Sequence, residues 1–62
     1  MLKYYIKRPD KGTYMSHLFE DVDTKRFRAK NKRDAIYYNI EQIAIDVSNT
    51  FKFKTVVEVV ND

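Results

Sequence analysis

The sequence predicts an α+β fold, a two-layer sandwich in which one helix packs on a small, mostly antiparallel sheet in the order β-β-β-α-β. Two observations carry this prediction. Apolar and polar residues alternate over residues 2–7 and again over 51–60, which is typical of half-buried strands. Between them, apolar residues recur at helical spacing over residues 32–48. The chain has 62 residues, so we expect a single domain, 1–62.

The first two strands are expected to form a hairpin. The turn after residues 2–7 contains Pro9, Asp10 and Gly12, three residue types that favour tight turns. With a four-residue loop over 9–12, the paired residues are Ile6 with Met15, Tyr4 with His17 and Leu2 with Phe19. This register gathers the apolar side chains of the hairpin on one face of the sheet.

A third strand is expected over residues 26–30, after a turn over 21–25 that lacks glycine. The expected pairs are Phe19 with Phe27, His17 with Ala29 and Glu20 with Arg26. The alternation continues here, so Phe27 and Ala29 extend the apolar face, and the basic residues between them extend the opposite face.

One long helix is expected from Lys32 to Ser48, about 25 Å in length at 1.5 Å per residue. Asn31 is a suitable N-cap, and Asn49 is expected to end the helix in a left-handed conformation. Ile40 lies at the centre of the apolar stripe, so we expect it to be fully buried. The stripe consists of Ile36, Ile40, Ile43, Ala44 and Val47.

The last strand is expected over residues 51–60. The predicted helix is long enough for a right-handed crossover. The last strand would then lie parallel to the third strand or, at the far edge of the sheet, parallel to the first.

The composition bounds the class of protein. A domain of this size buries only about 60% of the surface of its unfolded chain, and without cysteine no disulfide can stabilise it. No apolar run approaches the roughly 18 residues that a membrane helix needs, and no signal peptide pattern opens the chain. We therefore expect a cytoplasmic protein without a membrane partner.

Catalytic chemistry is not expected. His17 is the single histidine, there is no cysteine, and no serine lies in a nucleophile motif. The acidic residues Glu20, Asp21 and Asp23 lack the glycine-containing loop of a calcium site. One glycine in the whole chain leaves no glycine-rich phosphate loop. We expect a protein that is not an enzyme and that needs no metal or other cofactor.

Charge placement is the strongest functional signal. The sheet face away from the helix is expected to carry seven basic side chains and two tyrosines. This predicted binding face consists of Lys3, Tyr5, Lys7, Tyr14, Arg26, Arg28, Lys30, Lys52 and Lys54. Such a face suits an acidic protein surface or a nucleic acid, whose phosphates meet the cations and whose bases stack on the rings. It is also typical of an ordinary solvated sheet face.

Apolar residues outside the predicted core indicate self-association. Clusters of this kind mark interaction sites, so we expect a homodimer through the outer face of the helix or through the edge of the last strand. The residues concerned are Tyr38, Ile45, Val56 and Val60.

The segment from Arg26 to Ala44 resembles parts of two protein families. Through Phe27, Lys30 and Ala35 it resembles the strand-to-helix junction of the three-stranded DNA-binding domains of phage-type tyrosine integrases. It is also similar to small early phage proteins that bind host machinery, such as the short inhibitors of bacterial RNA polymerase, which share a strand-helix-strand ending. The first resemblance implies a sheet face that reads DNA, and the second implies a host protein as partner.

The leading prediction is a small binding protein, encoded by a phage or mobile element, that binds and modulates a host protein through its basic sheet face. The alternative is a DNA- or RNA-binding module that uses the same face. Within that face we expect Arg28 to matter most, because arginine forms two-pronged contacts to carboxylate or phosphate that lysine cannot form.

Overall fold

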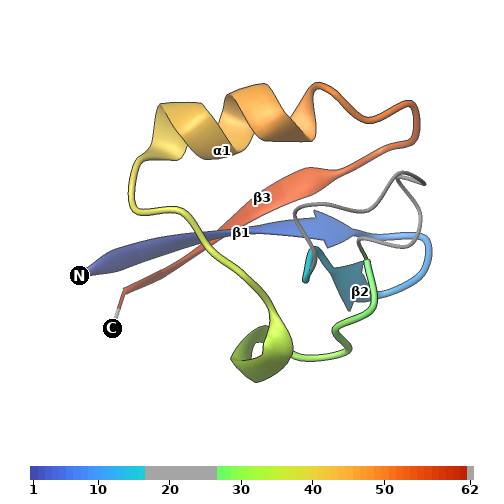
Figure 1. Cartoon of the computed structure of the whole chain (residues 1–62), viewed down its shortest axis with the longest axis horizontal. Helices are drawn as coiled ribbons and strands as arrows, with labels where there is room; N and C mark the ends of the chain where they lie inside the picture. The colour runs from blue at the N-terminus through green and yellow to red at the C-terminus, as the bar shows by residue number, and fades with distance from the viewer. Residues whose placement is uncertain (17–26, 62) are drawn as a thin grey trace.

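The computed structural model describes residues 1–16 and 27–61. Within these residues, three strands form one antiparallel sheet in the order β2-β1-β3, and a single α-helix packs on one face of it (Figure 1). This arrangement confirms the predicted α+β class. The elements are β1 (Leu2–Arg8), β2 (Thr13–Tyr14), a 3-10 turn (Lys32–Asp34), α1 (Glu41–Ser48) and β3 (Val56–Asn61).

The predicted hairpin register is confirmed. Lys7 pairs with Tyr14, and the same register continues where the N–H of Met15 donates to the carbonyl of Ile6 at 2.8 Å. Gly12 closes the turn with a φ of +67°, a conformation that residues with a side chain rarely adopt. The expected partner of Tyr4, His17, lies outside the described residues, and the described chain pairs Tyr4 with another segment.

That segment is the start of the expected helix. Tyr38 and Tyr4 exchange two main-chain hydrogen bonds, at 2.8 and 2.9 Å. Their pairing holds residues 36–38 extended beside β1, and the run Ile-Tyr-Tyr at these positions suits an extended chain better than a helix. The prediction of one helix from Lys32 to Ser48 is therefore wrong: a 3-10 turn and an extended stretch precede an α1 of eight residues.

The structure also differs from the prediction at the two ends of the helix. Asn31 precedes the 3-10 turn and makes no side-chain capping bond, and Asn49 ends α1 with a right-handed φ of −75°. Ile40 becomes the residue before α1 and is 58% exposed, so the prediction of its burial is wrong. Ile43, on the first turn of α1, is also exposed.

The predicted third strand is wrong within residues 27–30. Ala29 forms one isolated bridge within the described residues, with Tyr14. His17, Phe19, Glu20, the turn over 21–25 and Arg26 lie outside the described residues.

The last strand is antiparallel to β1, and the prediction of a parallel strand is wrong. Its register runs from Leu2 opposite Asn61 to Lys7 opposite Val56. Residues 36–38 run antiparallel to β1, and the chain turns back before α1. The helix α1 therefore runs in the same direction as β1, and β3 runs in the opposite direction (Figure 1).

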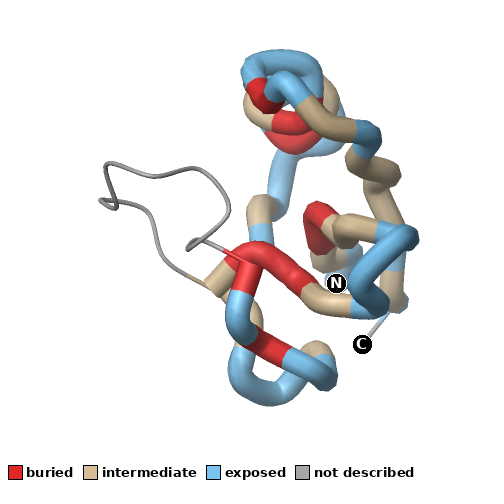
Figure 2. The backbone as a smooth tube through the Cα atoms, turned by 90° about the vertical axis from the view of Figure 1, so that its right-hand side faces the viewer, coloured by how far each residue is buried: buried red, intermediate tan, exposed pale blue. Residues whose placement is uncertain are grey.

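The core lies between α1 and the sheet. Ile6 and Met15 are the most deeply buried large side chains of the described chain. The rings of Phe27, Phe51 and Phe53 pack against one another with centroids 5.0 to 5.4 Å apart. Ile36, Tyr38 and Val47 pack against this cluster. Figure 2 shows how the buried residues follow these elements through the centre of the molecule.

A second, smaller cluster lies on the other face of the sheet. Tyr5, Tyr14 and Ala29 are buried there, with Ala35 and Val60 against them. The stretch that contains Ala29 and Ala35 thus covers part of the face that the sequence predicted to be open. Among the described residues, no helix combines the length and the apolar character needed to span a bilayer.

Candidate functional site

Four basic residues gather in one short stretch, which we call the basic segment: Arg28, Lys30, Lys32 and Arg33. Its first half alternates, because Phe27 and Ala29 are buried while Arg28 and Lys30 are exposed. The following 3-10 turn leaves Arg33 exposed and directs Lys32 back to the sheet. The basic segment therefore presents three cationic side chains to solvent.

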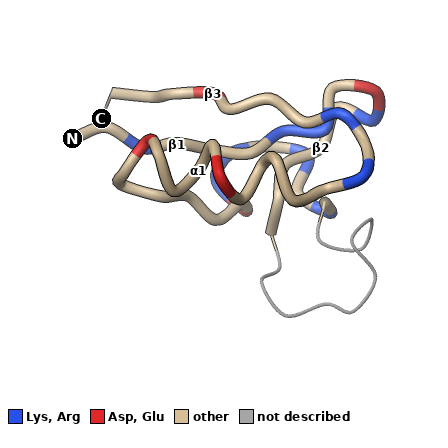
Figure 3. Tube along the Cα trace, turned by 90° about the horizontal axis from the view of Figure 1, so that it is seen from above, with Lys and Arg blue, Asp and Glu red and all other residues tan. Residues whose placement is uncertain are grey.

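Acidic residues of the described chain lie on both sides of the sheet. Two acidic residues, Glu41 and Asp46, lie on α1 (Figure 3). The 3-10 turn lies on the far side of the sheet from α1 (Figure 1). Asp34 lies within that turn, so residues 28–34 carry four cations against one carboxylate, although the whole chain carries a net charge of only +3.

A shallow open depression of about 500 Å³ lies along the basic segment. The Ser16 hydroxyl at its wall accepts a hydrogen bond from the Arg28 main-chain N–H at 3.4 Å. The guanidinium, ammonium, amide and hydroxyl groups of the depression suit an anionic group such as a carboxylate or a phosphate, and the Asp34 carboxylate in the same lining opposes one. The residues that line the depression are Ser16, Arg28, Ala29, Lys30, Asn31 and Asp34.

The two tyrosines of the predicted binding face are buried. Tyr5 is 6% exposed and Tyr14 is 8% exposed, and their rings meet edge to face with centroids 6.2 Å apart. The ammonium of Lys3 lies 4.8 Å from the centre of the Tyr37 ring, and that of Lys7 lies 5.5 Å from the Tyr14 ring. The rings of Tyr5 and Tyr14 are thus covered, whereas the Tyr37 ring beside Lys3 is exposed.

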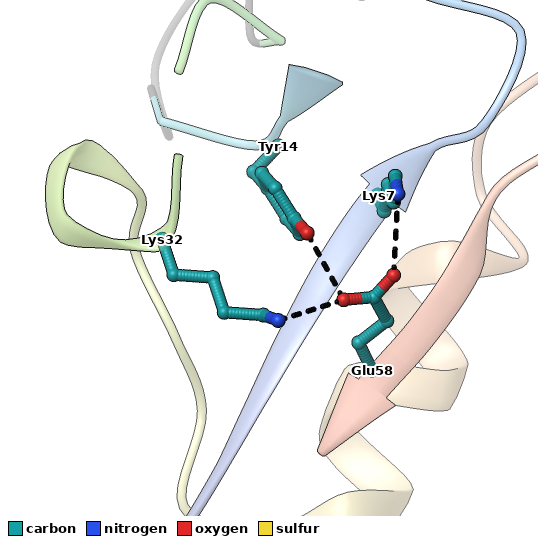
Figure 4. Close-up of polar contacts among 4 residues, drawn as sticks. All are labelled: Lys7, Tyr14, Lys32 and Glu58. Carbon is teal, nitrogen blue, oxygen red and sulfur yellow. Dashed lines mark hydrogen bonds and ion pairs between the residues drawn. The ribbon is translucent and has the colours of Figure 1, made fainter. Parts of the chain in front are cut away.

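Glu58 on β3 is the centre of a polar cluster on the same face (Figure 4). Its carboxylate accepts a hydrogen bond from the Tyr14 hydroxyl at 3.0 Å and forms ion pairs with Lys32 at 2.9 Å and Lys7 at 3.4 Å. The hydrogen bond from Lys32 lowers the pKa of the Glu58 carboxyl against the opposing effect of desolvation. The same bond raises the pKa of Lys32. Lys7 and Lys32 thus stabilise the fold through their ion pairs with Glu58.

The structure does not bring all the predicted binding residues together. Lys52 and Lys54 are exposed in the loop between α1 and β3, away from the 3-10 turn (Figure 1). Arg26 lies outside the described residues. Of the predicted face, Arg28 and Lys30 remain side by side at the depression. Sequence reasoning missed Arg33, because the predicted helix placed it on a different element.

The residues predicted for self-association lie differently from expectation. Tyr38 packs against the main core and Val60 against the second cluster, while Ile45 and Val56 are half-buried. The large apolar residues that the described chain does expose are Met1, Leu2, Tyr37, Ile40, Ile43 and Val59.

Within the described residues, no group of three or more histidine, cysteine, aspartate or glutamate side chains could hold a metal ion. The basic segment with its depression is the candidate site. Comparison with protein families, with curated proteins and with solved structures finds no match for this chain.

Proposed function

We propose that this chain is a small non-enzymatic binding protein that docks on an acidic surface of a partner protein through its basic segment. The observation that carries this proposal is the exposure of Arg28, Lys30 and Arg33 beside a depression with hydroxyl and amide groups in its wall. An acidic side chain of the partner that enters the depression would meet both a guanidinium and an ammonium group.

The charge distribution supports the same direction of docking. A field from clustered cations speeds encounter with an acidic surface and decays over a Debye length of about 8 Å at physiological salt. The acidic residues of α1, Glu41 and Asp46, lie on the other side of the sheet. They disfavour docking of an acidic surface on α1, whereas residues 28–34 carry four cations against the one carboxylate of Asp34.

A protein partner is favoured over a nucleic acid by the burial of Tyr5 and Tyr14. Proteins that hold single strands stack the bases on exposed rings, and these two rings are covered. Three exposed cations on one short stretch also make a smaller footprint than the tracks that follow a nucleic-acid backbone. The resemblance to small early phage proteins supports a host protein as the partner, whose activity the bound chain would modulate.

The test is a pull-down from nuclease-treated host lysate with matched charge reversals. Arg28→Glu with Lys30→Glu alters the basic segment, while Lys52→Glu with Lys54→Glu makes the same change of net charge in the α1–β3 loop. We expect the first pair to lose the partner and the second to keep it. Equal retention, or equal loss, contradicts the proposal.

The nucleic-acid alternative has its own readout. If nuclease removes every captured partner, and titration with generic duplex DNA weakens steeply with salt, the basic segment binds nucleic acid and the proposed protein partner is wrong.

A further inference from the structure

The strand β3 presents an open edge. Among the described residues, β1 is the one strand that pairs with it. Tyr4 and Ile6 direct their main-chain groups to the opposite side of β1, toward Tyr38 and Met15. Because these directions alternate along a strand, the residues of β1 between them bond to β3.

The alternation fixes which groups of β3 point outward. Lys3, Tyr5 and Lys7 of β1 oppose Val60, Glu58 and Val56, and these are the pairs that exchange hydrogen bonds. The N–H and C=O groups of Val57, Val59 and Asn61 therefore point away from β1. An edge of this kind is a template for another strand.

Apolar surface adjoins the open edge. Val59 is 57% exposed, and its partner in the register is Tyr4 of β1. Leu2 and Ile43 are 43% and 44% exposed. Seen from above, α1 overlies β1 while β3 lies to one side of it (Figure 3). The helix thus leaves Val59 uncovered beside the edge.

We propose that β3 pairs edge to edge with β3 of a second copy of this chain, antiparallel, about a two-fold axis at Val59. The two three-stranded sheets become one continuous sheet, closed by a symmetric interface. Val59 faces Val59 of the other copy, and Val57 faces Asn61. About six main-chain hydrogen bonds form across the axis, two for each pair of outward-pointing residues.

Charge excludes the neighbouring register with its axis at Glu58. An axis one residue earlier would place the two Glu58 side chains directly opposite each other, and like charges in that position are destabilising. An axis at Val59 instead opposes each Glu58 to Val60 of the other copy. Lys7 and Lys32 of the same chain already compensate the Glu58 carboxylate. The three residues whose main-chain groups point outward, Val57, Val59 and Asn61, are uncharged, so two copies of this edge can meet without opposing like charges, which is why we propose a second copy as its occupant.

In the proposed dimer, the side chains of residue 59 from the two copies lie opposite each other across the axis, and the test uses this contact. Val59→Lys and Val59→Glu each place like charges in contact, so each variant alone should sediment as a 7.5 kDa monomer at micromolar concentrations where the wild type is a dimer. A one-to-one mixture of the two variants should restore the dimer. Asn39→Lys, on an exposed residue of another segment, adds a charge but should leave the dimer intact.

Amide hydrogen exchange of the wild type gives an independent readout without any substitution. The N–H groups of Val57, Val59 and Asn61 should gain protection as the protein concentration rises, while that of Glu58 should be protected throughout. A wild type that stays monomeric across the micromolar range, or folded variants whose mixture does not associate, would overturn the proposal. Neither outcome bears on the basic segment.

Discussion

The ammonium of Lys32 lies 2.9 Å from the carboxylate of Glu58 and ties the 3-10 turn to β3. The two residues reach each other across the face of the sheet that α1 leaves free, next to the hydroxyl of Tyr14 (Figure 4). This contact fixes the 3-10 turn against the sheet, and it fixes the basic segment as well, because Lys32 belongs to both.

Glu58→Gln should lower the free energy of unfolding by about 1 kcal/mol, since an amide keeps a hydrogen bond but loses both ion pairs, and half-exposed pairs contribute modestly. Urea denaturation measures the change. The matched control is Asp46→Asn on α1, where the carboxylate accepts one exposed hydrogen bond from Gln42. We expect the control to change stability by less than half as much. Equal effects would show that the polar cluster adds no stability.

The effect of Glu58→Gln should depend on pH. The bond from Lys32 lowers the pKa of the Glu58 carboxyl in the folded protein, so folding favours the ionised form. This stabilisation is complete above the carboxyl's pKa in the unfolded chain, about 4.3, and is lost as the pH falls through the lower pKa of the folded state.

The measurement is the difference in unfolding free energy between the wild type and Glu58→Gln, at neutral pH and in acid below both pKa values. We expect the difference to shrink in acid. A difference that stays constant would mean that the charge of Glu58 does not contribute.

Ile6→Ala should destabilise the fold by about 2–5 kcal/mol, because it leaves a cavity in the main core. Ile6 is 1% exposed. The same substitution at Ile40, which is 58% exposed, should change stability by no more than about 0.5 kcal/mol. Thermal melts compare the two variants. If Ile40→Ala proved as costly as Ile6→Ala, α1 would have to begin earlier than Glu41.

Gly12→Ala should cost about 1–2 kcal/mol, because a left-handed backbone strains a residue with a side chain. Gly12 has a φ of +67°, and an added Cβ would meet no atom within 4 Å, so the cost is conformational and not steric. Gly12→Asn, a residue type that tolerates this region, should cost less. Chemical denaturation of the two variants separates strain from packing, and an equal loss would argue against strain.

The parts of the fold that local sequence determines were predictable. The register of the first hairpin follows from the turn residues and the alternation on either side, and the structure has it where Ile6 meets Met15. The helix was overextended because Ile36 fits the helical spacing as well as it fits an extended strand. The interaction that decides between them, Tyr38 with Tyr4, joins distant residues and leaves no local signal.

The candidate site was likewise predictable only in the part that local sequence determines. Arg28 and Lys30 could be placed on one outward face because Phe27 and Ala29 alternate with them. Arg33 and the role of Lys32 depend on the 3-10 turn, which the sequence predicted as helix. The burial of Tyr5 and Tyr14 could not be predicted. The stretch that covers them contains Ala29 and Ala35, and its path over the sheet depends on tertiary contacts.

The central strand of the sheet is the first to be made, and its main neighbour, β3, is the last. During synthesis, the edge of β1 that pairs with β3 therefore stays unpaired. The hydrogen bonds between β1 and β3 can form only after the intervening chain has been made. Pairings so distant in sequence slow folding relative to helical proteins of similar size. For this chain, the order of synthesis makes β1 the segment most exposed to wrong pairing before the native sheet closes.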